Sequence, residues 1–225
     1  MISRVTRSKA DAAASYDRLS RWYDGLAGST EKKYRDLGLQ ALDAQQGEHI
    51  LEIGYGTGQC VVALAKAVGP AGKVCGIDIS EGMRTIAARR AHQAGVSGWV
   101  DVRVGDAVQL PYEPGSFDAV FMSFTLELFD TPEILLVLEQ CRQVLRSGGR
   151  IGLVAMVKPD RPGFAVRLYE WFHARWPAMM DCRPILAQQA LQEAGFTIEY
   201  VQRLWMWGLP VDVIRAQQGS ASCKP

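Results

Sequence analysis

A Glu-x-Gly-x-Gly-x-Gly pattern is the feature of this sequence that most directly suggests chemistry. It comprises Glu52, Gly54, Gly56 and Gly58. The pattern follows a short apolar run, residues 49–53, that is typical of a buried strand, and it precedes a helical pattern over residues 60–68. A glycine turn between strand and helix lets a ligand approach the backbone, because no β-carbon obstructs it. The free N–H groups of the following helix point toward that ligand.

The spacing of the glycines can be compared with two common nucleotide-binding motifs, the dinucleotide site and the P-loop. A dinucleotide site requires Gly-x-Gly-x-x-Gly, but the position of the third glycine is occupied by Gln59. A P-loop requires Gly-Lys-Ser/Thr after the turn, and no such triplet follows. The turn therefore indicates neither a nicotinamide oxidoreductase nor a P-loop enzyme.

Two further acids follow predicted strands. Asp78 ends the strand expected at 72–78, and Asp106 comes shortly after the strand expected at 99–104. Asp78 lies roughly twenty residues beyond the first glycine, where a carboxylate can accept hydrogen bonds from two ribose hydroxyls. Either acid alone is consistent with a solvated loop or a helix cap. In register with the glycine turn, they favour a cofactor site at the carboxyl ends of the strands.

The elements that must position these residues alternate along the chain. Strands are expected at 49–53, 72–78, 99–104, 117–123, 150–157, 196–205 and 209–215, and helices at 10–26, 31–42, 60–68, 81–94, 131–145, 164–176 and 185–194. Short turns between strands and helices imply a parallel, doubly wound sheet. The last two strands have no helix between them, so we expect an antiparallel hairpin. A polar, disordered tail is expected from Gln217.

Composition limits the class of protein. The chain has 225 residues, enough for one well-buried α/β domain, with 48% hydrophobic and 22% charged residues. A net charge of +1 argues against a nucleic-acid partner. No apolar run reaches the ~20 residues of a membrane span, and residues 1–14 lack a signal-peptide core. The five cysteines have no metal-ligand spacing, so we expect reduced thiols, no metal and a cytoplasmic protein.

The glycine pattern and the order of elements over roughly residues 45–216 resemble the class I S-adenosylmethionine-dependent methyltransferases. The resemblance implies an α/β fold, with a doubly wound seven-stranded, mostly parallel sheet in the order 3-2-1-4-5-7-6, an antiparallel C-terminal hairpin and N-terminal helices. Gly105–Val120, Leu145–Arg150 and the early Ser15-Tyr16-Asp17 and Tyr23-Asp24 are similar to the ubiquinone/menaquinone-biosynthesis C-methyltransferases and related small-molecule enzymes.

This resemblance assigns roles to individual residues. The implied cofactor is S-adenosyl-L-methionine, with Glu52 orienting the glycine turn near its amino end, Asp78 holding the ribose and Asp106 contacting the adenine amino group. Other residues expected to contact it are Tyr23, Gly54, Gly56, Gly58, Ile79, Met83, Ala107 and Phe124. We expect a single methyltransferase domain: an N-terminal helical lid (1–44), a cofactor-binding core (45–157), acceptor-binding helices (158–195), a terminal hairpin (196–216) and a tail (217–225).

Catalytic candidates are fewer. Glu127 could act as a general base, or it could order its loop through backbone hydrogen bonds. His173 lies in an aromatic-rich helix, where core packing is the usual role, although such a segment often binds the acceptor in small-molecule methyltransferases. Asp181 and Arg183 could form an ion pair that fixes a loop.

The predicted function is methyl transfer from S-adenosylmethionine to a small, largely apolar acceptor, similar to a quinone precursor. Met122-Ser123-Phe124-Thr125 replaces the Asn/Asp-Pro-Pro-Tyr of amine-modifying DNA and protein methyltransferases, which argues against those substrates. Two alternatives remain open: an N-methyltransferase for lipid head groups, with peripheral membrane contact, and a non-catalytic cofactor-binding regulator.

Overall fold

The computed structural model describes residues 9–19, 28–158 and 183–219. Seven strands form one sheet in the order β3-β2-β1-β4-β5-β7-β6. Strands β1 to β5 pair in parallel, and β7 is antiparallel to both β5 and β6. The predicted fold class and strand order are therefore confirmed.

The strands are β1 (His49–Ile53), β2 (Lys73–Asp78), β3 (Val100–Val104), β4 (Phe117–Ser123), β5 (Leu145–Met156), β6 (Phe196–Met206) and β7 (Leu209–Gln218). The α-helices of the described residues are α1 (Lys9–Leu19), α3 (Gly28–Leu42), α4 (Gln59–Val68), α5 (Glu81–Gln93), α6 (Thr131–Val144) and α8 (Ala187–Glu193). Short 3-10 turns occupy Ser97–Trp99 and Leu126–Leu128.

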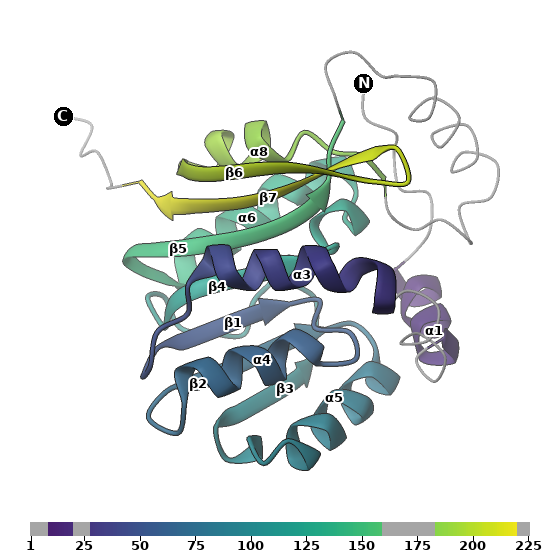
Figure 1. Cartoon of the computed structure of the whole chain (residues 1–225), viewed down its shortest axis with the longest axis vertical. Coiled ribbons are helices and arrows are strands. Elements are labelled where there is room, and N and C mark those ends of the chain that lie inside the picture. The colour runs from purple at the N-terminus through teal and green to yellow at the C-terminus, as the bar shows by residue number, and fades with distance from the viewer. Residues whose placement is uncertain (1–8, 20–27, 159–182, 220–225) are drawn as a thin grey trace.

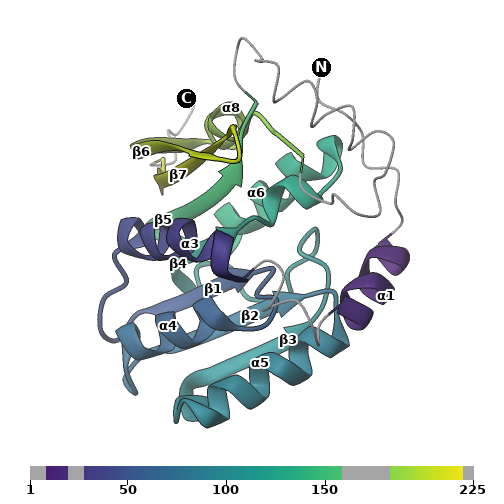
Figure 2. The same ribbon diagram turned by 45° about the vertical axis from the view of Figure 1, so that its right-hand side comes forward.

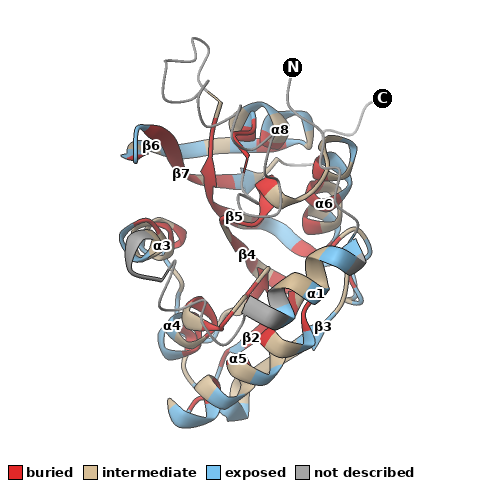
Figure 3. Ribbon diagram, turned by 90° about the vertical axis from the view of Figure 1, so that its right-hand side faces the viewer, coloured by how far each residue is buried: buried red, intermediate tan, exposed pale blue. Residues whose placement is uncertain are grey.

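Helices cover both faces of the sheet (Figures 1 and 3). Helices α3, α4 and α5 contribute to one apolar cluster with residues such as Leu42, Leu64 and Ala87, and α6 and α8 contribute to a second with residues such as Leu138 and Leu191. Because both faces are covered, the central strands are apolar on both sides, as the buried runs of β1 and β4 show. The two clusters hold the strand ends in a fixed register.

Strands β1 to β5 end at the same edge of the sheet because they run in parallel. The glycine turn after β1 lies at this edge, and α1 lies near it, beside α5 (Figure 2). This edge is where ligands bind in open parallel sheets.

Several predicted boundaries were wrong. Helix α8 spans Ala187–Glu193 rather than 185–194. Helix α1 covers Lys9–Leu19, and residues 20–26 of the helix predicted at 10–26 lie outside the described residues. Strand β5 begins at Leu145 rather than Arg150, because Leu145 already pairs with Phe117 before a register shift. Gln217 and Gln218 belong to β7 and pair with β6, so the tail does not begin at Gln217. The helix predicted at 164–176 lies outside the described residues.

The hairpin between β6 and β7 turns through Trp207 and Gly208, whose φ angles are 51° and 79°. Positive φ at both central residues is the geometry of a two-residue hairpin turn that follows the natural twist of the strands. The residues Trp205 and Trp207 are 62% and 72% exposed. None of the described helices is long and apolar enough to cross a membrane.

Candidate cofactor and acceptor site

The three glycines of the turn have positive φ angles but different surroundings. A β-carbon on Gly54 would lie 2.3 Å from Thr125 Cγ2, and one on Gly58 would lie 2.7 Å from the Ala87 Cβ and 2.9 Å from its Cα. Packing alone therefore requires glycine at both positions. A β-carbon on Gly56, whose φ is 50°, would meet no atom within 4 Å. Gly56 borders open space at the point where a ligand would approach the turn.

Asp78 connects the end of β2 to this turn. Its Oδ2 accepts a hydrogen bond from the Gly56 amide at 2.9 Å, and its Oδ1 accepts one from the Ser80 amide at 3.0 Å. Burial raises the pKa of Asp78, while the backbone hydrogen bonds oppose that shift. Ile79 beside it is half-buried, and Met83 is buried in the first turn of α5. Asp78 therefore lies within hydrogen-bond distance of the glycine turn, and the roles predicted for all three residues in cofactor binding stay predictions.

Glu52 is 2% exposed, and its Oε2 has no hydrogen-bond partner among the described residues. Burial raises the pKa of Glu52 well above its usual range, and the Asp78 carboxylate raises it further, whereas Arg35 lowers it. A buried carboxyl oxygen without a partner is costly, so a donor from a ligand would stabilise it.

Asp106 follows β3 and is held by helix α1. Lys9 Nζ lies 2.6 Å from Asp106 Oδ2 and 2.6 Å from Glu133 Oε1, so one lysine joins two acids. At the other end of α1, Asp17 accepts hydrogen bonds from Ser80 Oγ at 2.5 Å and the Gly82 amide at 2.9 Å. Ala107 is buried beside Asp106. No pattern in the sequence pointed to Lys9, and Asp17 was singled out only as part of the Ser15-Tyr16-Asp17 resemblance, because the contacts of both residues depend on where α1 packs.

Phe124 directly follows β4 with a φ of 52°, a conformation that is strained for an aromatic residue. The Phe124 amide donates to the Val154 carbonyl at 2.8 Å, which fixes the backbone against β5. The Tyr34 ring meets the Phe124 ring edge-on, with centroids 6.2 Å apart. Tyr34 also donates its hydroxyl to the Trp205 carbonyl at 2.7 Å, and so joins the site edge to the C-terminal hairpin.

Glu127 is completely buried in the 3-10 turn Leu126–Leu128, which follows β4. Its Oε1 accepts a hydrogen bond from the Met156 amide at 3.0 Å, and its Oε2 has no partner in the described part of the chain. Burial raises the pKa of Glu127 to about 8, while the Met156 amide and Arg183 oppose the shift. The loop-ordering role is thus present in the geometry, and the second oxygen remains available for a proton.

Arg183 is buried and donates to Thr131 Oγ1 at 3.1 Å and to the Phe129 carbonyl at 2.5 Å. These bonds fix the segment between Glu127 and α6. The other partner of the predicted ion pair, Asp181, lies outside the described residues, as do Tyr23 and His173. Their predicted roles stay predictions.

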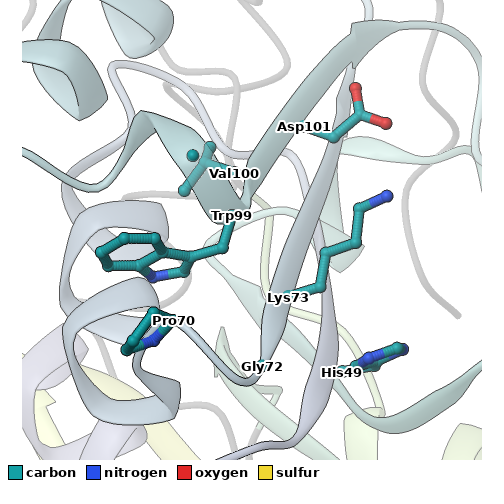
Figure 4. Close-up of a pocket in the computed structure, with 8 residues that line it drawn as sticks. His49, Pro70, Gly72, Lys73, Trp99, Val100 and Asp101 are labelled. Carbon is teal, nitrogen blue, oxygen red and sulfur yellow. The ribbon is translucent and has the colours of Figure 1, made fainter.

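A surface hollow lies at the opposite edge of the sheet (Figure 4). Its lining includes His49, Lys73 and Val100, which are the first residues of β1, β2 and β3. Trp99 there donates its indole N–H to the Ala65 carbonyl at 2.7 Å. The hollow is therefore separate from the strand ends that carry the glycine turn. Over residues 9–19, 28–158 and 183–219, no cluster of three His, Cys, Asp or Glu side chains could hold a metal ion.

Comparison with known proteins identifies the class that this fold and site define. Residues 50–149 match a family described as "Methyltransferase domain". The demethylmenaquinone methyltransferase of Bacillus subtilis (strain 168) is 30% identical over 161 residues, which cover 70% of this chain and 68% of the relative. That of Geobacillus kaustophilus (strain HTA426) is 31% identical over 174 residues, covering 77% and 72%. The chain belongs to the class I S-adenosylmethionine-dependent methyltransferases.

Solved structures confirm the fold. The [4+2]-cyclase SpnF aligns with a TM-score of 0.78 at 20% identity, over 98% of this chain and 99% of that one. Geranyl diphosphate methyltransferase in complex with GPP and sinefungin aligns with a TM-score of 0.71 at 19% identity, over 83% and 77%. Since one of these neighbours is a cyclase, the fold alone does not define the acceptor.

The chain is an enzyme that uses S-adenosylmethionine as its cofactor. The residues at the strand ends fit such a group. Open space beside Gly56, acceptor oxygens on Asp78 and the unpartnered Oε2 of Glu52 suit a ligand with a ribose and an amino group.

Proposed function

We propose that this methyltransferase acts on a small, largely apolar acceptor, of the quinol class suggested by its demethylmenaquinone methyltransferase relatives. The observation that carries the proposal is an apolar group beside the carboxyl ends of β4 and β5. It comprises Tyr34, Phe124, Met156, Met206 and Leu209, which belong to one cluster. Aromatic and methionine side chains suit a flat, apolar molecule, since both adapt to its shape without hydrogen bonds.

When bound, S-adenosylmethionine supplies a methyl group already activated by a positively charged sulfur. The protein then has to align the acceptor, exclude water and remove a proton where the acceptor carries one. Gly56, Asp78, Glu52 and Asp106 are proposed to hold the cofactor, and Phe124 to separate it from the acceptor.

Glu127 is proposed as the proton acceptor. A general base works best when its pKa lies near the working pH, and burial brings this carboxyl to about 8. Its Oε1 is engaged by the Met156 amide, so Oε2 is the atom that would take the proton. His173, in the region 158–195 that is proposed to bind the acceptor, is proposed as a second polar group of that site, and residues 1–44 are proposed to serve as a lid.

The proposal is tested by incubating the purified chain with methyl-labelled S-adenosylmethionine and a panel of acceptors. The panel should contain reduced naphthoquinones and benzoquinones, an apolar phenol, phosphatidylethanolamine and a polar amine. Label in a quinol or phenol would support the proposal. Label only in the polar amine would contradict it.

A second candidate function is methylation of a lipid head group at a membrane surface. The exposed indoles of Trp205 and Trp207 at the hairpin tip favour it, because tryptophan is suited to the boundary between water and lipid. Co-sedimentation with phosphatidylethanolamine vesicles tests this candidate: Trp207→Ser should release the protein, whereas Trp99→Phe, at the opposite edge of the sheet, should not. Labelled phosphatidylethanolamine in the acceptor panel would then favour it over the quinol.

A further inference from the structure

Arg35 lies beside the glycine turn although it belongs to α3, a helix that precedes the whole sheet. Its side chain is 12% exposed. Its Nη2 donates to Gln59 Oε1 at 2.5 Å, and its Nη1 lies 3.7 Å from Glu31 Oε2. Gln59 is the first residue of α4, directly after Gly58. Packing of α3 thus brings a guanidinium to the start of the helix that the glycine turn opens.

The positive charge of Arg35 also acts on two groups beside the glycine turn. It opposes the rise in pKa that burial causes at Glu52, the acid before the turn, and at Cys60, the second residue of α4. A cation that acts on both groups stands between the end of β1 and the first turn of α4. Arg35 therefore contributes positive charge to the glycine turn itself.

The first turn of α4 adds to this charge. Its N-cap is Gly58, which offers no side-chain acceptor to the free N–H groups of the helix. Those N–H groups and the helix dipole favour a negative group at this end. Together with the Arg35 guanidinium, they make a site suited to a carboxylate, which arginine can bind through two parallel hydrogen bonds.

Glu52 supplies a carboxyl oxygen next to it. Its Oε2 is buried and has no hydrogen-bond partner in the described ranges, so it calls for a donor. An acceptor oxygen for an amino group and a guanidinium for a carboxylate, close together, match the two polar groups of an α-amino acid. S-adenosylmethionine carries an α-amino acid at the end opposite its adenine.

We propose that Arg35 binds the carboxylate of the cofactor's methionyl part, while Glu52 accepts a hydrogen bond from its amino group. Arg35 is thus a cofactor-binding residue supplied by the N-terminal region. The inference deepens the cofactor site, and it does not depend on the identity of the acceptor.

Two ligands separate this role from a structural one. S-adenosylhomocysteine keeps the amino-acid end, whereas methylthioadenosine lacks it and keeps the adenosine and sulfur. In calorimetric titrations, Arg35→Met should weaken binding of S-adenosylhomocysteine by roughly tenfold or more, because one charge-assisted contact is lost. Binding of methylthioadenosine should change by less than about twofold. Arg35→Lys should recover part of the loss, since it restores the charge without the planar fork.

Two control variants sharpen the comparison. Lys33→Met removes the same charge from an exposed position of the same helix and should change neither affinity. Arg90→Met removes the guanidinium that donates to the Thr57 carbonyl and hydroxyl within the turn. This variant should therefore weaken the binding of both ligands to a similar degree. Thermal unfolding establishes that each variant is folded. If Arg35→Met does not fold, Arg35→Lys takes its place in the comparison. Arg35→Lys should weaken the binding of S-adenosylhomocysteine and leave the binding of methylthioadenosine unchanged.

Equal weakening of both ligands in the folded Arg35 variant would overturn the proposal, because Arg35 would then act only by supporting the turn. Unchanged affinity for S-adenosylhomocysteine would overturn it as well.

Discussion

The Gly56 amide and the Asp78 carboxylate form a hydrogen bond of 2.9 Å that joins the glycine turn to the end of β2. The acid therefore does two things at once. It fixes the backbone of Gly56, which among the three glycines of the turn is the one that borders open space, and it presents its oxygens at the same edge. A substitution at Asp78 should consequently affect both the shape of the turn and the binding of a ribose.

Asp78→Ala should weaken the binding of S-adenosylhomocysteine by a few kcal/mol, because buried donors on the turn and on the ligand lose their acceptor. Asp78→Asn keeps one acceptor oxygen, so its loss should be smaller, and its melting temperature should stay closer to that of the wild type. Calorimetry with both variants measures the difference. An unchanged affinity in Asp78→Ala would remove Asp78 from the cofactor site.

Substitutions at Gly56 and Gly58 should have different effects, one on cofactor binding and the other on stability. Gly56→Val should abolish cofactor binding while the protein stays folded, apart from the strain of about 1–2 kcal/mol that a β-carbon costs at a φ of 50°. Gly58→Val should instead lower the melting temperature strongly, because its β-carbon would overlap the Ala87 backbone. Melting curves and titrations of the two variants distinguish these effects. A collapsed Gly56→Val would show that this glycine is structural.

The pH dependence of stability reports on Glu127. Burial raises the pKa of Glu127 to about 8, so the folded chain retains this proton at pH values where the unfolded chain has lost it. The stability linked to this group is present below its ordinary pKa of 4.5 and is lost as the pH rises through 8. Relative to Glu127→Gln, the wild type should therefore become less stable between pH 5 and pH 9.

Melting temperatures of both proteins across that range provide the measurement, and a constant difference would show that the carboxyl is not buried in its neutral form. Glu127→Gln keeps an acceptor for the Met156 amide, so it should fold normally while methyl transfer falls. Full activity in that variant would eliminate Glu127 as the base.

Helix α1 should slow the release of the cofactor product. Lys9 connects it to Asp106 and Glu133, and these side chains are between 30% and 42% exposed, so the pairs are weak and screened by salt. Lys9→Met should raise the dissociation rate of S-adenosylhomocysteine a few-fold at low salt and have little effect at high salt. Stopped-flow displacement measures the rate. Lys32→Met, which removes an exposed ion pair with Asp36, is the control. An equal rise in the dissociation rate in this control would show that the effect comes from the change in net charge and not from the contacts of Lys9.

The sequence predicted the frame of this site well, because its signals are local. Glycines at alternate positions after an apolar strand, and an acid at the end of the next strand, depend only on chain order, and the sheet places Gly56 and Asp78 within hydrogen-bond distance. The start of β5 was misplaced because Ser147-Gly148-Gly149 has the composition of a turn, whereas in the structure it continues a strand through a register shift.

The contributions of the N-terminal helices could not be predicted from the sequence. Arg35 and Lys9 have ordinary surroundings in the sequence, and the motif that contains Asp17 does not indicate its partner. Only tertiary packing brings the three residues to Gln59, Asp106 and Ser80. Tyr34 is similar, since its bond to the Trp205 carbonyl joins residues at opposite ends of the chain. Such long-range contacts leave no periodicity or spacing that a sequence could reveal.

The most direct test of the account is transfer of the labelled methyl group from S-adenosylmethionine to a reduced naphthoquinone, with the product extracted into organic solvent. The account predicts labelled organic product with the wild type, none with Gly56→Val and a marked loss with Glu127→Gln. A wild-type protein that binds S-adenosylhomocysteine but labels no apolar acceptor of the panel would contradict it.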